Sequence, residues 1–222
     1  MLDTCAKSGP YMIQDGEVVY LVDDDAAIRE GLSEQLMAQG RHVVSFATAE
    51  EFLDYIRTDT AACLILDVGL PDLNGLELQE RLRSSSTPSI IFISGQSDIC
   101  TSVRAMKAGA IEFLVKPVEP DALGRAIDLG FTRDRRQRQR VAEFSELRRR
   151  YDLLTPRERE VLPLIVAGLL NKQAAAELGI SEVTLQFHRG QIMRKMEAPS
   201  FAELVRMCGR LSLRLPDVNH SL

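Results

Sequence analysis

Acidic side chains stand where two apolar runs of this 222-residue chain end. The run at 64–66 stops at Asp67, and the run at 17–22 stops at three consecutive aspartates that begin with Asp23. Carboxylates close together repel one another, and they become tolerable around a hard divalent cation such as Mg²⁺. A carboxylate can also attack a phosphoryl group and form an aspartyl phosphate. Alone, an Asp after a strand can equally cap the next helix, so the other elements must decide.

Five short β-rich runs alternate with stretches of helical periodicity in the first 130 residues. The runs cover 17–22, 42–46, 62–66, 89–93 and 111–115. This alternation forces parallel strands joined by right-handed crossovers, so the predicted fold is α/β, a (βα)5 doubly wound parallel sheet. The helix predicted at 47–57 has its own start signal, because Thr48 can cap it and Glu51 stands three residues later.

Polar side chains follow four of these five strands. They are Asp23 and Asp24, Asp67, Ser94 and Lys116. The carboxyl ends of parallel strands meet at one edge of the sheet, where α/β proteins bind ligands. A metal and the ammonium of Lys116 would neutralise charge on a transferred phosphoryl group, and the hydroxyl of Ser94 could hydrogen-bond it. Agreement among four strand ends favours a phosphoryl-transfer site over a solvated acidic edge.

The net charge of −5 hides two unlike halves. Residues 1–130 hold 10 basic and 21 acidic residues, whereas residues 131–222 hold 17 basic and 11 acidic residues. The acidic first half is suited to binding a metal ion or other cations, and the basic second half is suited to binding a polyanion. No apolar run approaches the roughly 18 residues of a membrane span, and the N-terminus lacks a signal-peptide pattern, so no membrane partner is predicted. Scattered cysteines without CxxC spacing predict the reduced thiols of a cytoplasmic protein. They are Cys5, Cys63, Cys100 and Cys208.

The predicted organisation has two domains joined by a helix. We expect a flexible lead-in at 1–16, the α/β domain at 17–131, a long helical linker at 132–150, a small all-α four-helix domain at 151–215 and a tail at 216–222. The linker is rich in arginine and carries one apolar stripe that includes Val141, Phe144 and Leu147. Three roles fit it: an exposed linker, a dimer-forming helix, or an arm that contacts phosphates. We favour a helical linker that also packs between two chains.

The basic half begins with a strong helix start, in which Thr155 is the predicted N-cap and Glu158 completes a capping box. Helices predicted at 171–178 and 182–196 flank a tight turn at Gly179, which is the pattern of a helix-turn-helix. One more predicted helix follows them and completes the set of four.

The second helix of this pair is the candidate DNA reader, because a helix that presents Gln and Arg can bond to base edges in a major groove. Gln186 suits adenine and Arg189 suits guanine. Lys172, Arg194 and Lys195 suit phosphates, which position a domain without reading sequence. The complete set of predicted DNA contacts is Lys172, Thr184, Gln186, Phe187, Arg189, Arg194 and Lys195.

The segments LVDDD, LILDVGLPD, FISG and FLVKP, in this order and spacing, resemble the receiver domain of two-component response regulators. The resemblance implies that Asp67 accepts a phosphoryl group from a sensor histidine kinase and that Lys116 pairs with this group. Ser94 and Phe113 are the switch residues that it implies. The peptide bond between Lys116 and Pro117 is expected to be cis.

For the metal, the resemblance implies one Mg²⁺ ion bound directly by Asp24, Asp67 and the backbone carbonyl of Gly69, with Asp23 acting largely through water. Gly69 also bears on a rival from another class. A haloacid-dehalogenase-like phosphohydrolase forms an aspartyl phosphate on a parallel sheet too, but it would want an acid at this place. Steady release of phosphate from small esters would support that enzyme.

The segments LTPREREVL, GLLNKQAAAELGIS and VTLQFHRGQIMRKM together resemble the LuxR-type helix-turn-helix of the FixJ/NarL class. Many members carry Val-Lys where this chain has Leu185 and Gln186, so the target sequence stays open and Phe187 becomes a candidate for contacting thymine methyl groups. The resemblance implies double-stranded promoter DNA as a partner and a homodimer on phosphorylation. RNA polymerase is a further candidate partner.

Together these features predict a cytoplasmic transcription regulator of a two-component system, switched by phosphorylation and not an enzyme. A kinase would phosphorylate Asp67. Rearrangement of Ser94 and Phe113 would then alter the face formed by the fourth helix, fifth strand and fifth helix. Besides the phosphohydrolase, a regulator that binds DNA without phosphorylation is an alternative. The intact set of Asp67, Ser94 and Lys116 argues against it.

Overall fold

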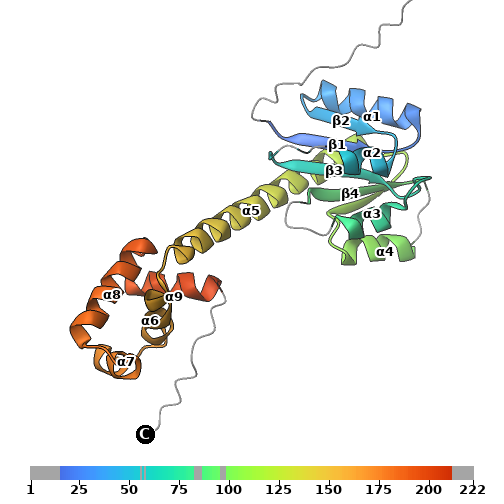
Figure 1. Cartoon of the computed structure of the whole chain (residues 1–222). Helices are drawn as coiled ribbons and strands as arrows, with labels where there is room; N and C mark the ends of the chain where they lie inside the picture. Colours follow the sequence, from blue (N-terminus) through green and yellow to red (C-terminus); the bar gives the residue numbers. More distant parts are fainter. Residues whose placement is uncertain (1–15, 56, 58, 83–86, 96–98, 212–222) are drawn as a thin grey trace, which may run out of the picture. The chain divides into compact units, whose positions relative to one another are not determined.

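The computed structural model of the chain describes residues 16–55, 57, 59–82, 87–95 and 99–211. Residues 1–15 and the tail predicted at 216–222 lie outside this description. The chain forms two compact units that divide between Arg138 and Gln139, inside the predicted linker (Figure 1). Helix α5 runs without interruption through this division, and its role as a linker or dimer helix stays a prediction.

Five parallel strands build the sheet of the first unit, in the order β2-β1-β3-β4-β5. The strands are β1 (Val18–Val22), β2 (His42–Phe46), β3 (Ala62–Asp67), β4 (Ser89–Ser94) and β5 (Glu112–Val115). The predicted doubly wound α/β fold is therefore confirmed, and each strand lies within one residue of its predicted bounds. Strand β1 lies between β2 and β3, so the acids that follow β1 and β3 start from neighbouring strands.

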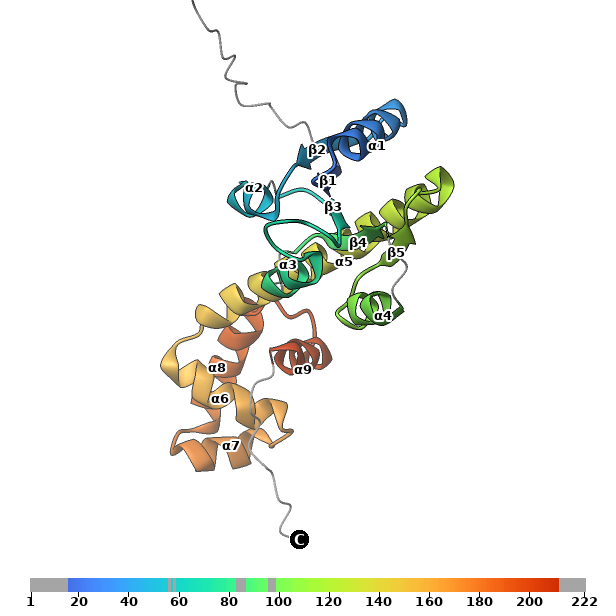
Figure 2. The same ribbon diagram turned by 90° about the vertical axis from the view of Figure 1, so that its right-hand side faces the viewer.

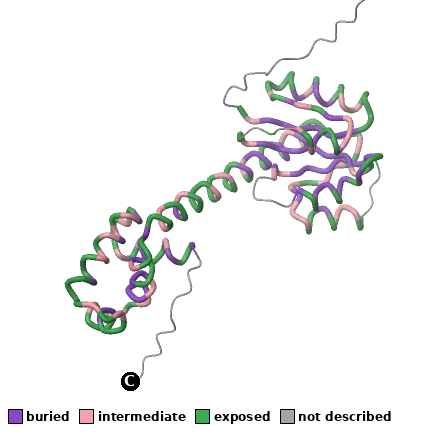
Figure 3. Tube along the Cα trace, in the orientation of Figure 1, coloured by how far each residue is buried: buried purple, intermediate pink, exposed green. Residues whose placement is uncertain are grey.

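Helices cover both faces of this sheet, as Figure 2 shows. They are α1 (Ala26–Ala38), α2 (Ala49–Asp54), α3 (Gly75–Arg81), α4 (Ile99–Lys107) and α5 (Pro120–Asp152). Helices α1 and the first part of α5 pack on one face, and α2, α3 and α4 pack on the other. Every residue of β1 and β3 is buried, which is visible in Figure 3. Covering both faces explains why these strands read as continuous apolar runs.

Helix α2 has the predicted start but not the predicted end. The hydroxyl of Thr48 accepts a hydrogen bond from the Glu51 backbone N–H at 3.1 Å, and the Glu51 carboxylate accepts one from the Ala47 N–H at 2.8 Å. The helix ends at Asp54, so the predicted extension to 57 is wrong. Tyr55 turns to extended backbone, and its ring packs against Phe46 at 5.3 Å between centroids.

Helix α5 lies close against β3, the strand that carries Asp67. A Cβ added at Gly130 would lie 2.7 Å from the sulfur of Cys63, so only glycine allows this approach. At the start of β3, the buried carboxylate of Asp134 accepts a hydrogen bond from the Ala62 N–H at 3.0 Å. Cys63 is a buried thiol in no disulfide, and burial raises its pKa.

In its described residues, 139–211, the second unit holds the last turns of α5 and the four further helices that were predicted. These are α6 (Pro156–Val166), α7 (Asn171–Leu178), α8 (Glu182–Lys195) and α9 (Phe201–Arg210). The predicted capping box is present, because Thr155 caps α6 and the Glu158 side chain returns to the Thr155 N–H at 2.7 Å. Gly179 ends α7 in the left-handed region, with φ of 66°. No helix in the described part of the chain is long and apolar enough to cross a membrane.

Candidate functional site

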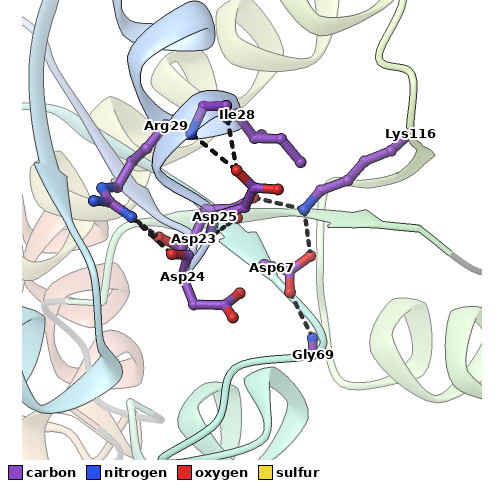
Figure 4. Close-up of polar contacts among 9 residues, drawn as sticks. Asp23, Asp24, Asp25, Ile28, Arg29, Asp67, Gly69 and Lys116 are labelled. Carbon is purple, nitrogen blue, oxygen red and sulfur yellow. Dashed lines mark hydrogen bonds and ion pairs between the residues drawn. The ribbon is translucent and has the colours of Figure 1, made fainter.

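Three of the predicted polar residues meet at the carboxyl edge of the sheet. The ammonium of Lys116 lies 2.7 Å from an Asp23 carboxylate oxygen and 2.9 Å from an Asp67 carboxylate oxygen (Figure 4). Both acids are buried, with relative exposures of 0% and 6%. Buried carboxylates are costly unless a cation pairs with them, and Lys116 supplies that cation from the end of β5.

Backbone N–H groups hold the remaining carboxylate oxygens. The Gly69 N–H donates to Asp67 at 2.8 Å, and the Asp25 N–H donates to Asp23 at 3.0 Å. Each carboxylate is thus fixed on one oxygen by Lys116 and on the other by backbone. The orientation of both acids is set before any ligand arrives, which is the preorganisation that phosphoryl transfer needs.

Burial and these bonds shift the pKa values of Asp23 and Lys116. Burial raises the pKa of Asp23, and the hydrogen bonds from Lys116 and Asp25 lower it less, so the pKa stays above its ordinary value. For Lys116, burial lowers the pKa, but its bonds to Asp23 and Asp67 together raise it above the ordinary value. Lys116 is therefore a stable cation near neutral pH, ready to pair with anionic oxygens.

The third aspartate serves the helix instead of the site. The side chain of Asp25 caps α1 by accepting hydrogen bonds from the Ala27 and Ile28 N–H groups at 2.9 and 3.3 Å. Arg29 was not predicted from the sequence, and its guanidinium donates to the carbonyl oxygens of Asp23 at 2.7 Å and Asp24 at 3.1 Å. Its position one turn after the N-cap was the only signal that could have pointed to it.

The predicted metal ligands are hard oxygen donors at this edge. Asp24 is exposed, and Figure 4 shows its carboxylate on the side of Asp67 and Gly69. Among the described residues, no three His, Cys, Asp or Glu side chains form a ready metal cage. Magnesium tolerates this, because it keeps several waters and binds few protein carboxylates together with phosphate oxygens. The residues present therefore fit a magnesium ion.

The predicted switch residues lie on β4 and β5. Ser94 ends β4 and is buried, and its carbonyl accepts the Lys116 N–H at 2.8 Å. Phe113 is half-buried on β5, with its ring centroid 6.3 Å from that of Phe92. The expected cis peptide bond between Lys116 and Pro117 is confirmed.

The second unit exposes one set of predicted DNA contacts. Thr184, Gln186, Phe187 and Arg194 are exposed on α8, and Lys172 is exposed at the start of α7. The Thr184 hydroxyl shares a hydrogen bond with that of Ser181, the N-cap of α8, at 2.8 Å. These side chains are available to a partner.

Two other predicted contacts are held inside the unit. The guanidinium of Arg189 donates to the Asn171 side chain at 3.2 Å and lies over the ring of Phe201 at 4.5 Å from its centroid. The ammonium of Lys195 lies 2.7 Å from the buried carboxylate of Glu158. Burial raises the pKa of Glu158, but bonds from Lys195 and Thr155 bring it below its ordinary value. These contacts fix α8 against α6, α7 and α9.

Known proteins share both units with this chain. The family described as "Response regulator receiver domain" matches residues 19–128, and the one described as "Bacterial regulatory proteins, luxR family" matches residues 152–208. Nodulation protein W of Bradyrhizobium diazoefficiens is 41% identical over 205 residues, which cover 92% of this chain and 89% of that protein. This chain belongs to the response regulator family. Its first unit is the receiver domain and its second is the LuxR-type domain.

Two further similarities span both domains. The response regulator protein TodT of Pseudomonas putida is 40% identical over 216 residues, covering 93% of this chain and 95% of TodT. The solved structure of the response regulator StyR is 44% identical, with a TM-score of 0.77, and covers 88% of this chain and 99% of StyR. Phosphorylation-controlled regulation of transcription is the function that this architecture serves. Neither the phosphohydrolase nor a phosphorylation-independent regulator is favoured.

Proposed function

We propose that Asp67 is the residue that accepts the phosphoryl group and that its loading controls DNA binding by the LuxR-type domain. The observation that carries this proposal is the bridge from Lys116 to Asp23 and Asp67, at 2.7 and 2.9 Å. A carboxylate oxygen of Asp67 attacks the phosphorus of a phosphohistidine on a sensor kinase. The new P–O bond forms as the P–N bond breaks, and the imidazole nitrogen takes the electron pair.

Asp24, Asp67 and the carbonyl of Gly69 are the residues that we propose for Mg²⁺, with Asp23 acting through water. The ion would supply charge neutralisation for the phosphoryl oxygens. Lys116 would exchange part of its contact with the acids for contact with the phosphoryl group, because its ammonium already faces Asp67. Arg29 holds the two backbone carbonyls beside the acids, so it positions the loop that carries Asp24.

Ser94 and Phe113 connect the site to a surface. The Ser94 hydroxyl would hydrogen-bond a phosphoryl oxygen, and the space it leaves would let Phe113 turn inward. Val115 lies two residues from Phe113 on the same side of β5, so it moves with that part of the strand. Exposed apolar side chains continue this face onto α4, and they are Ile99, Val103 and Met106. We propose that homodimers form through this face after phosphorylation.

Gln186 and Phe187 are the proposed base readers, and Lys172 and Arg194 are the proposed phosphate contacts. The internal contacts of Arg189 and Lys195 favour positioning roles for these two residues. We place the protein in the cytoplasm, where a kinase and promoter DNA are both accessible. RNA polymerase is a further candidate partner at a promoter.

The test treats the full chain with a small phosphodonor and Mg²⁺ and measures its intact mass. Wild type gains one phosphoryl group, and Asp67→Asn gains none. The matched control is Asp72→Asn, which changes an exposed aspartate in the following turn and labels like wild type. Equal labelling of Asp67→Asn and wild type would overturn the acceptor assignment.

The second arm measures affinity for promoter DNA before and after labelling. Tighter binding by the labelled protein supports control by phosphorylation, and dimer formation is followed in the same samples. Unchanged affinity would favour the alternative regulator that binds DNA without phosphorylation. Continuous release of phosphate from small esters would favour the phosphohydrolase.

A further inference from the structure

One side of α8 carries four exposed residues at helical spacing, Val183, Phe187, Gly190 and Arg194. Residues three and four apart on a helix are neighbours, so these four form one surface, which we call the reading stripe. Val183 is 76% exposed and Phe187 is 62% exposed. Single exposed apolar residues are ordinary, whereas two adjacent ones form a small apolar patch that a partner could cover.

The domain core does not use the apolar members of the reading stripe. On the opposite side of α8, Leu185 and Ile192 are fully buried and supply its share of the core. The ring of His188 lies edge-on to that of Phe187, with 5.9 Å between centroids. This contact limits the freedom of the Phe187 ring, so the ring needs less ordering when a partner binds.

Gly190 leaves the α8 backbone without a side chain on the same side of the helix. A glycine in the interior of a helix destabilises it relative to alanine. Apart from its chain neighbours and the backbone of α8 itself, no described atom lies within 4 Å of the place that a Cβ at Gly190 would take, so packing does not require glycine there. The same holds for Gly124 in α5, so the open space alone does not indicate a partner. The other use of glycine is to let a backbone approach a ligand closely.

Charge indicates which partner this is. Within the described second unit, Lys172 and Arg194 have no carboxylate within 4.0 Å, whereas Lys195, Arg206 and Arg210 are in ion pairs. Arg194 belongs to the reading stripe itself, and Lys172 opens the helix that precedes α8 in the helix-turn-helix. The Arg194 guanidinium donates to the Gln191 side chain at 2.6 Å, which leaves its positive charge without a counter-ion. Cations without a carboxylate partner beside an exposed helix suit the phosphates of a DNA duplex.

We propose that Val183 and Phe187 read the C5-methyl groups of thymines in the major groove, and that Gly190 lets the α8 backbone come close to the bases. The inference rests on the proposed DNA binding by this domain. Thymine is the base that presents a methyl group in the major groove, and apolar side chains match it. For contacts with thymine methyl groups the sequence indicated Phe187 alone, and the structure adds Val183 to the same surface.

The test removes single methyl groups from the DNA. The full chain, treated with a small phosphodonor and Mg²⁺, first selects duplexes from a random pool, and we expect thymines in each half-site. Each thymine is then replaced by deoxyuridine, which lacks only the methyl group. Affinity should fall about fourfold at each contacted thymine, the effect of one methyl group withdrawn from contact.

Variants assign each methyl group to a side chain. Val183→Ala and Phe187→Ala should each lose the response to deoxyuridine at one position and keep it at the other. The matched control is Leu153→Ala, which removes an equally exposed apolar side chain outside α8 and keeps both responses. If wild type binds thymine and deoxyuridine duplexes equally, the proposal is overturned.

Gly190→Ala separates stability from recognition. We expect the melting temperature of the LuxR-type domain to rise by roughly 4–8 °C, and affinity for the selected duplex to fall at least fivefold. A variant that is more stable and binds as tightly as wild type would contradict close backbone approach.

A failure of the proposed DNA binding can be distinguished from a failure of thymine recognition. If the full chain binds no duplex of any sequence at low salt, DNA binding itself is wrong. If it binds duplexes with a strong salt dependence but without thymine preference, DNA binding is supported and the recognition of thymine methyl groups is contradicted. Selection of a single-stranded RNA or of a protein instead of duplex DNA would overturn both.

Discussion

The proposed phosphorylation site and the reading stripe prepare for their partners in opposite ways. At the carboxyl edge of the sheet, Asp23 and Asp67 are buried and each has both oxygens bonded. On α8, Val183 and Phe187 stand exposed, with the Phe187 ring edge-on to His188. Phosphoryl transfer needs charges fixed in advance, because reorganising them during the reaction raises the barrier. Base recognition needs surfaces that stay open until the duplex replaces the solvent.

Two glycines, one in each domain, show the same difference between a packed interior and an exposed surface. Gly130 faces β3, the strand that ends in Asp67, and an added Cβ there would meet the sulfur of Cys63 at 2.7 Å. Gly190 faces open space on α8. The first glycine serves packing within the receiver domain, and the second is the one that we propose for close approach to DNA. A residue type therefore has to be interpreted with its surroundings.

Removing the ammonium of Lys116, which pairs with Asp23 and Asp67, should have the largest effect on the stability of the receiver domain. Lys116→Met leaves Asp23 and Asp67 buried, adjacent and without their ammonium, so the receiver domain should lose about 3 kcal/mol of stability. Hydrogen exchange of the β3 amides in the full chain measures this loss. Added Mg²⁺ should recover part of the stability, because a second cation then faces the acids. Lys107→Met, at an exposed lysine of α4, is the control and should change little.

Filling the buried glycine should have the next largest effect. Gly130→Ala forces α5 away from β3 and should cost about 1–3 kcal/mol, again measured by exchange of the β3 amides. In a Cys63→Ala background the clashing sulfur is gone, so the same change should cost less. Gly124→Ala lies on the same helix with open space around it and should stabilise by up to about 1 kcal/mol. Equal effects of the two substitutions would show that the close approach of α5 is unimportant.

The smallest expected effect is a pH dependence of the LuxR-type domain. The pKa of Glu158 lies below its ordinary value of 4.5 in the folded domain, so the unfolded chain takes up a proton more readily. The stabilisation is fully present above about pH 4.5 and is lost as the pH falls through the folded pKa. The loss for one proton is at most about 1.4 kcal/mol per pH unit.

Amide exchange of α6 and α8, followed from about pH 6 down to about pH 3, measures this loss. Glu158→Gln should flatten the profile, because the amide still accepts from Thr155 but does not titrate. Glu160→Gln is the control, since Glu160 is exposed and pairs only with Arg157 in the described part of the chain. A profile that keeps its slope in Glu158→Gln would assign the acid loss to other carboxylates.

Much of this molecule follows from local sequence. The strand bounds were predicted to within one residue, and the caps at Thr48 and Thr155 and the helix end at Gly179 were predicted correctly. These features depend on backbone geometry and on partners within four residues, which a sequence shows directly. The placing of Asp23 and Asp67 at one edge followed from the parallel connections alone.

Contacts between distant elements were decided only by the tertiary structure. The sequence offered Arg189 and Lys195 to DNA, whereas the fold turns them toward Phe201 and Glu158. It gave no sign that Arg29 holds two carbonyls or that Gly130 admits the sulfur of Cys63. Side-chain reach and the packing of helices set these partners, and neither is encoded in the spacing of one segment. Sequence thus determined which groups arrive at each surface, and packing determined which of them remain available there.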